Sequence, residues 1–183
     1  MGDIMQILWD KLLGYVDEVY KIHQEKLGDT YLDKKYFIEQ AKKNRLIIAK
    51  DDSQVLGYLI FDLTTEKEFF ESKHILDCGS DNLVLSLLTM AVKNERNGIG
   101  TMMTKYCIDK YNQVVKDMYS PVWKSVNGTN AHKLLMNCGF EIINEIENYW
   151  HEDSIGKEGY CPVCGTPCTC TMVIYKRKSS VGK

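Results

Sequence analysis

The chain has 183 residues and a mass of 21.1 kDa, a size that suits a single domain spanning residues 1–183. Lys and Arg total 23 against 25 Asp and Glu, so no excess of positive charge exists to neutralise a nucleic-acid backbone. The longest apolar run, Leu83–Val92, falls short of the roughly 20 residues that cross a membrane, and the N-terminus lacks a signal-peptide pattern. We expect a cytoplasmic protein with neither nucleic acid nor membrane as a partner. The sequence leaves open whether the protein forms a homodimer.

The first half of the chain is typical of a strand, two helices and a β-hairpin. Apolar residues recur at helical spacing after Asp10, and Asp33 precedes a second such segment as a helix N-cap. Two compact apolar segments flank the turn-forming residues Asp51–Ser53, which indicates a pair of antiparallel strands. The predicted elements are a strand at Met5–Trp9, helices at Asp10–Leu27 and Lys34–Asn44, and strands at Arg45–Lys50 and Val55–Leu63.

The second half alternates strands and helices after a mixed segment, residues 64–81, which we expect to form a loop with a helical turn. A buried strand, a polar glycine turn and a helix then follow one another. Gly139 stands where a left-handed residue ends a helix. The predicted elements are strands at Asn82–Val92, Met118–Val126, Glu141–Trp150 and Thr171–Lys176, and helices at Gly98–Asn112 and Asn130–Asn137.

The turn Glu95–Gly100 has the composition of an anion site. The first N–H groups of a helix lack partners within it, and the positive end of the helix dipole faces outward, which suits a phosphate or pyrophosphate. Gly98 and Gly100 let an anion approach the backbone, and Arg96 adds a cation. The turn lacks the Lys-Ser/Thr pair of a P-loop and the first glycine of a dinucleotide fingerprint, so we exclude both nucleotide sites. The alternative is that the two glycines only make a close strand-to-helix turn.

These residues resemble the core signature of the GNAT superfamily of acetyl-CoA-dependent N-acetyltransferases, Arg/Gln-x-x-Gly-x-Gly/Ala after an apolar strand. The matching segment runs from Leu88 to Gly100. A second family element, a helix that ends in Gly-Phe, matches Ala131–Phe140. Two motifs in the family's order make the resemblance specific, and in element order it covers Met5–Lys176.

The resemblance implies an α/β fold with a mixed, mostly antiparallel central sheet of about six or seven strands flanked by helices. In that fold a splayed pair of strands forms the slot for CoA. Backbone groups of the strand before the turn are expected to pair with the pantetheine arm of acetyl-CoA, and the turn is expected to hold the pyrophosphate. The cofactor-binding residues are then Thr89, Met90, Val92, Arg96, Asn97, Gly98, Ile99, Gly100 and Thr101.

The function implied is transfer of an acetyl group from acetyl-CoA to a primary amine of a small molecule or protein by direct attack. Such a reaction needs a neutral amine, a route for its proton and a polarised thioester carbonyl. Glu95 stands where the family has Arg or Gln, and Leu135 where a tyrosine acid is common. We predict Tyr149 as the catalytic acid, with Tyr119 as another candidate acid. His132 is a candidate base, and Asp77 and Asp81 are carboxylates that could reach the mouth of the cleft. The competing hypothesis is a non-catalytic module that binds CoA or a partner.

A cysteine cluster marks the polar loop at residues 151–170. Its C-P-x-C-G start is typical of a tight loop whose thiolates face one ion while backbone N–H groups support the sulfurs. We favour structural zinc over an iron–sulfur cluster or a metal-free loop, and His151 is an alternative ligand. The loop either shapes the specificity for the acceptor, or the cysteine cluster serves only to hold this long loop in one conformation. The predicted ligands are Cys161, Cys164, Cys168 and Cys170, whereas Cys78, Cys107 and Cys138 are expected to pack as small apolar residues.

Overall fold

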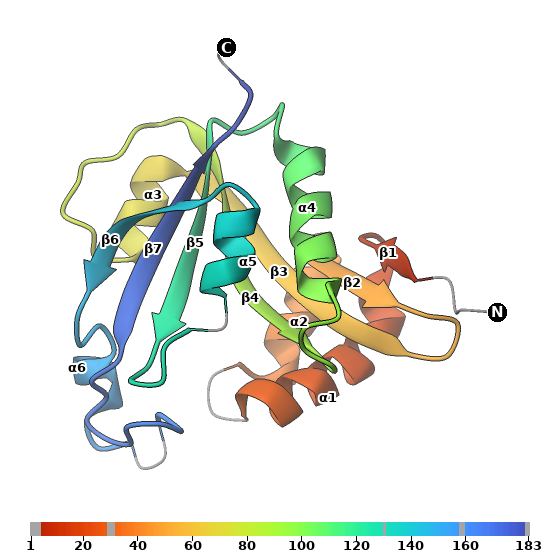
Figure 1. The fold of residues 1–183 in the computed structure, drawn as a ribbon, viewed down its shortest axis with the longest axis horizontal. Coiled ribbons are helices and arrows are strands. Elements are labelled where there is room, and N and C mark those ends of the chain that lie inside the picture. Colours follow the sequence, from red (N-terminus) through yellow and green to blue (C-terminus); the bar gives the residue numbers. More distant parts are fainter. Residues whose placement is uncertain (1–4, 29–31, 130, 158–159, 182–183) are drawn as a thin grey trace. The chain divides into compact units, whose positions relative to one another are not determined.

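The computed structural model describes residues 5–28, 32–129, 131–157 and 160–181. Within them, seven strands form a mixed, mostly antiparallel sheet in the order β1-β2-β3-β4-β5-β7-β6 (Figure 1). The strands are β1 (Gln6–Leu8), β2 (Leu46–Lys50), β3 (Val55–Thr65), β4 (Leu83–Val92), β5 (Asp117–Lys124), β6 (Glu141–Ile146) and β7 (Thr171–Lys178). The helices are the 3-10 helix η1 (Leu12–Tyr15), α1 (Val16–Leu27), α2 (Lys34–Lys42), α3 (Glu66–Ser72), α4 (Ile99–Tyr111), α5 (His132–Asn137) and α6 (His151–Ser154). The predicted α/β class and strand number are therefore confirmed.

Two segments differ from the sequence-based expectation. The mixed segment holds a two-turn helix, α3, because Thr65 and Glu68 form a capping box in which each side chain accepts the other's N–H, at 3.2 and 2.9 Å. The strand predicted at Glu141–Trp150 ends at Ile146, because Asn148 adopts a left-handed backbone with φ 54° and the short helix α6 follows. Asn130, the predicted start of α5, lies outside the described residues.

The chain divides into two compact units. The first comprises Met1–Asp62 and Leu87–Lys110, and the second Leu63–Ser86 and Tyr111–Lys183. None of the helices in the described ranges combines the length and the apolar character that a membrane crossing requires.

The core of the first unit lies on one face of the β2–β3 hairpin. The strands pair in antiparallel register from Leu46 opposite Ile60 to Lys50 opposite Val55. Because side chains alternate across a strand, one face of this pair turns to α1 and α2. Its fully buried residues are Leu46, Ile48, Tyr58 and Ile60 from the strands, with Val16, Val19, Ile22 and Phe37 from the helices.

Gly57 on β3 has no side chain, and this determines how closely β4 and α4 approach the other face of the hairpin. A Cβ at this position would lie 2.8 Å from Cγ1 of Val92, 3.0 Å from the carbonyl oxygen of Ala91 and 3.3 Å from Cε of Met103. Val92 ends β4 and Met103 belongs to α4, so the missing side chain lets both elements approach β3. The end of β4 and the helix α4, which flank the turn, are thereby packed closely on β3.

The second unit is built on β5, β7 and β6 (Figure 1). β5 pairs with β7 along its whole length, from Asp117 opposite Lys178 to Lys124 opposite Thr171, and β6 pairs with the other edge of β7. β4 joins β5 in parallel over Val84–Ser86. One face of this sheet buries an aromatic and aliphatic cluster of Phe69, Phe70, Val84, Tyr119, Met172 and Ile174. The cysteine loop connects β6 to β7 and therefore lies at the carboxyl end of β5.

Candidate functional site

The turn between β4 and α4 is open to solvent at its centre. Arg96, Asn97 and Gly98 are exposed, and the backbone is left-handed at Arg96 and Gly98, with φ 66° and 77°. The first helical bond runs from the N–H of Met102 to the carbonyl of Gly98, over 2.9 Å. A Cβ at Gly98 would meet nothing within 4 Å, so the backbone there is accessible. Together with the orphan N–H groups and dipole of a 13-residue helix, this makes the turn suited to an anion.

The other predicted cofactor residues lie around this turn. Thr89, Met90 and Val92 are half-buried on β4, and Gly100 and Thr101 are half-buried in the first turn of α4. Ile99 differs from them because its side chain is buried and anchors the helix, so only its backbone is available to a ligand. These residues lie in one stretch of the first unit, in the order that the sequence motif predicts.

The second motif forms the predicted helix and cap. α5 ends at Asn137, and Gly139 is left-handed with φ 80°. Leu135 is 3% exposed and its carbonyl accepts the N–H of Phe140 over 3.0 Å. Leu135, which replaces the family's tyrosine, is thus a core residue with no proton to donate. His132 lies on the same helix, and its Nδ1 is 2.8 Å from the Oη of Tyr175 on β7.

Tyr149, the predicted acid, belongs to an aromatic cluster after β6. Its ring packs edge-on against Trp150 with centroids 5.0 Å apart, and its N–H donates to the carbonyl of Cys170 over 3.2 Å. The other acidic candidates, Asp77 and Asp81, are exposed in the loop between α3 and β4. Tyr149 also packs against the aromatic cluster that contains Tyr119, whereas His132 pairs with Tyr175 on α5 and β7.

A polar cluster that the sequence did not indicate lies beside Tyr119. The Oη of Tyr119 donates to Glu66 of α3, whose other carboxylate oxygen accepts the N–H and hydroxyl of Ser80 at 3.0 and 2.8 Å. Lys176 Nζ lies 3.6 Å from Glu66 and 3.0 Å from Asp117. Glu66 and Tyr119 are 53 residues apart in the chain. No local pattern links them, so only the folded structure reveals the cluster.

The ionisation of this cluster argues against a role as general base. Burial raises the pKa of Glu66, but hydrogen bonds from Tyr119 and Ser80 and the charge of Lys176 outweigh it, leaving the pKa below its usual value. Burial, the hydrogen bond to Glu66 and its charge all raise the pKa of Tyr119. Glu66 is thus a weak base and Tyr119 a weak acid, so neither group is suited to proton transfer near neutral pH.

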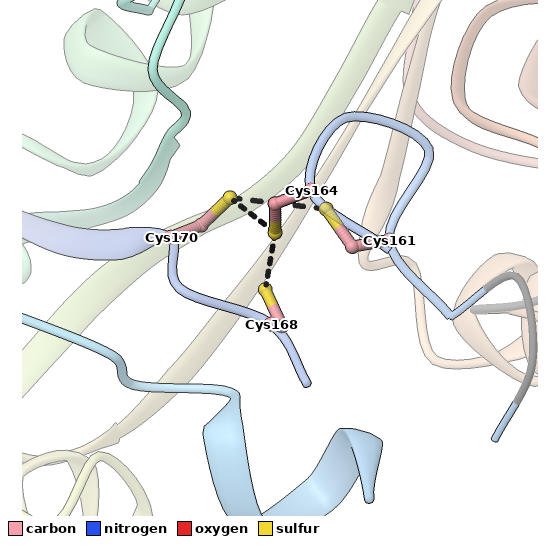
Figure 2. A group of neighbouring side chains, drawn as sticks. All are labelled: Cys161, Cys164, Cys168 and Cys170. Atoms are coloured by element: carbon pink, nitrogen blue, oxygen red, sulfur yellow. Dashed lines mark hydrogen bonds between the residues drawn. The ribbon is translucent and has the colours of Figure 1, made fainter. Parts of the chain in front are cut away.

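The four predicted cysteine ligands converge in the loop before β7 (Figure 2). Their sulfur atoms all lie within 4.8 Å of one another. The Sγ of Cys164 is 3.5 Å from Cys168 and 3.6 Å from Cys170, and the Sγ atoms of Cys161 and Cys170 are 3.8 Å apart. Four sulfurs around zinc, with Zn–S bonds of about 2.3 Å, form a tetrahedron with edges of about 3.8 Å. The arrangement therefore fits a four-coordinate thiophilic ion.

Backbone and side-chain groups support the sulfurs. The N–H of Thr169 donates to the Sγ of Cys164 over 3.3 Å, and the indole of Trp123 donates to that of Cys170. Burial by itself would raise the pKa of the Cys164 thiol. Hydrogen bonds from the Thr169 N–H and the neighbouring thiols lower the pKa by more than burial raises it, to about 6. A thiol that ionises readily and three buried partners are the chemistry of a structural metal centre.

The remaining cysteines and His151 behave differently. Cys107 and Cys138 are buried, as predicted, and burial raises the pKa of Cys107 to about 12. Cys78 is exposed, so the expectation that it packs as a small apolar residue is wrong. The loop before β4 places it on the surface. His151 Nδ1 lies 3.2 Å from Glu152. Among the described residues, the group whose ligand atoms are close enough to share one metal ion consists of the four cysteines and does not include His151.

Comparison with solved structures identifies the fold. A GNAT-family acetyltransferase from Bacillus cereus superposes with a TM-score of 0.63 at 17% identity, covering 96% of this chain and 98% of that one. NAA60 from Arabidopsis thaliana, in complex with acetyl-CoA, gives a TM-score of 0.72 at 12% identity, with 96% and 98% covered. The polyamine N-acetyltransferase of Drosophila melanogaster gives 0.66 at 9% identity, with 96% and 100% covered.

This chain therefore has the fold of the GNAT acetyltransferases over nearly its whole length. No protein-family model matches its sequence, and neither does any curated protein sequence. The likeness found by these comparisons lies in the three-dimensional arrangement and not in the bulk of the sequence.

Proposed function

We propose that this protein is an N-acetyltransferase that moves the acetyl group of acetyl-CoA to a primary amine of a small molecule or protein. The observation that carries the proposal is the open turn from Arg96 to Gly98 between β4 and α4, in a chain with the GNAT fold. One of the similar structures holds acetyl-CoA, and another is a polyamine N-acetyltransferase. The whole chain, residues 1–183, would act as one acyltransferase domain that includes the cysteine loop.

The end of β4 and the turn after it would bind different parts of acetyl-CoA. Thr89, Met90 and Val92 follow the stretch Val84–Ser86 that pairs with β5, so backbone groups on that edge of β4 would be available to an extended pantetheine arm. The N–H groups at the start of α4, with Arg96, would hold the pyrophosphate from Asn97 to Thr101. Since the turn carries Glu95 as well as Arg96, we ascribe affinity mainly to the backbone and the helix dipole.

The proposed chemistry is direct attack without a covalent enzyme intermediate. The lone pair of the neutral amine forms the new C–N bond, the C–S bond breaks and CoA leaves as a thiolate. The amine loses one proton and the thiolate gains one. Because Leu135 has no proton to give, we assign return of the proton to Tyr149, the half-buried phenol beside Trp150.

The four cysteines would bind one structural Zn²⁺. Three sulfur pairs lie at 3.5–3.8 Å and all four sulfurs lie within 4.8 Å of one another, which, with the burial of Cys161, Cys168 and Cys170, supports a closed tetrahedral site. When bound, the ion cross-links the loop between β6 and β7. A closed four-sulfur site leaves no position for a reacting water, so we place no chemical step on the metal.

The experiment that tests the proposal measures binding and turnover in sequence. A thermal-shift assay with CoA and acetyl-CoA comes first, followed by release of free CoA from acetyl-CoA with a panel of primary amines. We expect stabilisation by both ligands and CoA release that depends on an amine. Stabilisation without turnover on any amine would favour the CoA-binding module instead, and the lack of any shift would contradict a CoA site.

A further inference from the structure

The four cysteines of the candidate metal centre are not equally accessible. Cys161, Cys168 and Cys170 are 6%, 2% and 3% exposed, whereas Cys164 is half-buried. Cys164 lies in a tight turn, in which the N–H of Gly165 donates to the carbonyl of Cys161 over 3.0 Å. A Cβ added at Gly165 would meet nothing within 4 Å, so the chain beside Cys164 borders open space. A small reagent from solvent therefore reaches Cys164 more readily than the other three.

The distances between the sulfurs divide the centre into two pairs (Figure 2). In the first pair, the Sγ atoms of Cys164 and Cys168 are 3.5 Å apart, and in the second pair those of Cys161 and Cys170 are 3.8 Å apart. Cys164 also lies 3.6 Å from Cys170, but a bond between these two would take Cys170 away from Cys161. A disulfide bond is about 2.05 Å long, so each pair closes by about 1.5–1.8 Å. Two disulfides between neighbouring sulfurs therefore use all four cysteines.

An accessible thiolate with a second thiolate beside it is suited to oxidation by hydrogen peroxide. The first sulfur attacks one peroxide oxygen, the O–O bond breaks, and a sulfenic acid forms while the other oxygen leaves as hydroxide. The neighbouring thiolate then attacks that sulfur, so that the S–S bond forms, the S–O bond breaks and a second hydroxide leaves. Each disulfide thus gives two electrons to one peroxide, and two protons convert the hydroxides to water.

Oxidation of both pairs removes the charges that hold a metal ion. The thiolate is the form of cysteine that binds metal, and four thiolates become two neutral disulfides. We propose that hydrogen peroxide modifies this centre: it attacks Cys164 first, forms the two disulfides defined by the sulfur pairs, and releases the zinc ion. Two molecules of peroxide and four protons are consumed, and one Zn²⁺, two disulfides and four molecules of water are formed. The proposal rests on the proposed zinc site and is independent of acetyl transfer.

The test titrates the zinc-loaded protein with hydrogen peroxide. Free zinc is followed with a coloured chelator, and disulfides are mapped by mass spectrometry of unreduced peptides. We expect release of about one zinc ion per chain for about two equivalents of peroxide. At about one equivalent, the Cys164–Cys168 disulfide should be more abundant than Cys161–Cys170, and dithiothreitol with added zinc should restore the bound ion. The control is Cys78→Ser, which removes an exposed cysteine outside the centre and should release zinc at the wild-type rate.

The zinc content is measured before peroxide is added, which separates this proposal from the zinc site on which it rests. A chain that takes up no zinc would contradict the zinc site itself. A chain that binds one zinc ion and keeps it in excess peroxide, with its four thiols intact, would overturn the oxidation site alone. Formation of Cys161–Cys170 before Cys164–Cys168 would contradict first attack at Cys164. Slower release of zinc in Cys78→Ser would show that the oxidant enters outside the centre, and would also overturn the proposal.

Discussion

The backbone N–H of Cys168 donates a hydrogen bond to the hydroxyl of Ser154 over 2.7 Å, and that hydroxyl donates to the carbonyl of His151 over 2.7 Å. Ser154 is fully buried. This serine therefore ties a candidate metal ligand to the helix α6 that precedes it, and its loss leaves two backbone groups without their partner.

We expect Ser154→Ala to weaken zinc binding by about tenfold to 100-fold, the range typical of groups that orient metal ligands. The buried N–H of Cys168 would also add about 1–3 kcal/mol of destabilisation. Competition with a zinc-binding dye measures the affinity. Ser53→Ala, which removes a hydroxyl from an exposed turn in the first unit, is the matched control. Equal zinc affinity in both variants would contradict the assigned role.

Gly98 provides a test of the turn that avoids the charge of Arg96. A side chain at φ 77° costs about 1–2 kcal/mol, although open space surrounds the added Cβ. Gly98→Ala should therefore relax the turn and reduce the affinity for CoA in a calorimetric titration. In Gly14→Ala the added methyl also meets open space but the backbone is not left-handed, so its CoA affinity should match wild type.

Gly57 tests whether β3 holds the end of β4 in place. In Gly57→Ala the new methyl would lie 2.8 Å from Val92 and 3.0 Å from the backbone of Ala91, so β4 has to shift. We expect destabilisation of about 1–3 kcal/mol, measured by urea unfolding, and weaker CoA binding because Val92 lies next to the turn. If this variant had the same free energy of unfolding as wild type, β4 could move without loss of stability, and the role given to Gly57 would be contradicted.

The polar cluster makes a prediction about acid stability. The pKa of Glu66 is lowered from 4.5 in the folded state, so the stabilisation it contributes is present above pH 4.5 and is lost as the pH falls through the folded value. The free energy of unfolding, measured from pH 6 downward, should therefore fall less in Glu66→Gln than in wild type. The difference should begin at about pH 4.5. Glu71→Gln, an exposed change on the same helix, serves as the control. Identical slopes in all three proteins would contradict the assignment.

The features that the sequence predicted well are those with local causes. Asp33 accepts the N–H of Tyr36 over 2.9 Å as the cap of α2, and Gly139 ends α5 in a left-handed conformation. The cysteines lie within one short loop, so their spacing already implied that they converge. In each case the residues that interact are close in the chain.

The features that the sequence did not predict depend on distant partners. Tyr119 was only one of several candidate acids, because Glu66 and Lys176, which fix its hydrogen bond and electrostatic surroundings, lie more than 50 residues away in either direction. The strand before the cysteine loop was extended too far because its aromatic end, Tyr149 and Trp150, has the composition of a strand. Packing of Trp150 against the cysteine loop, and of both rings against the core of the second unit, overrides that preference.

The central claim is acetyl transfer to an amine, and it is tested most directly by following the acetyl group itself. Zinc-loaded protein is incubated with acetyl-CoA labelled with carbon-13 in the acetyl group and a mixture of primary amines and lysine-containing peptides, and the products are identified by mass spectrometry. The account predicts a labelled amide on an amine nitrogen in equal amount to the CoA released. Binding of acetyl-CoA with no labelled amide, or release of CoA as free acetate only, would contradict it.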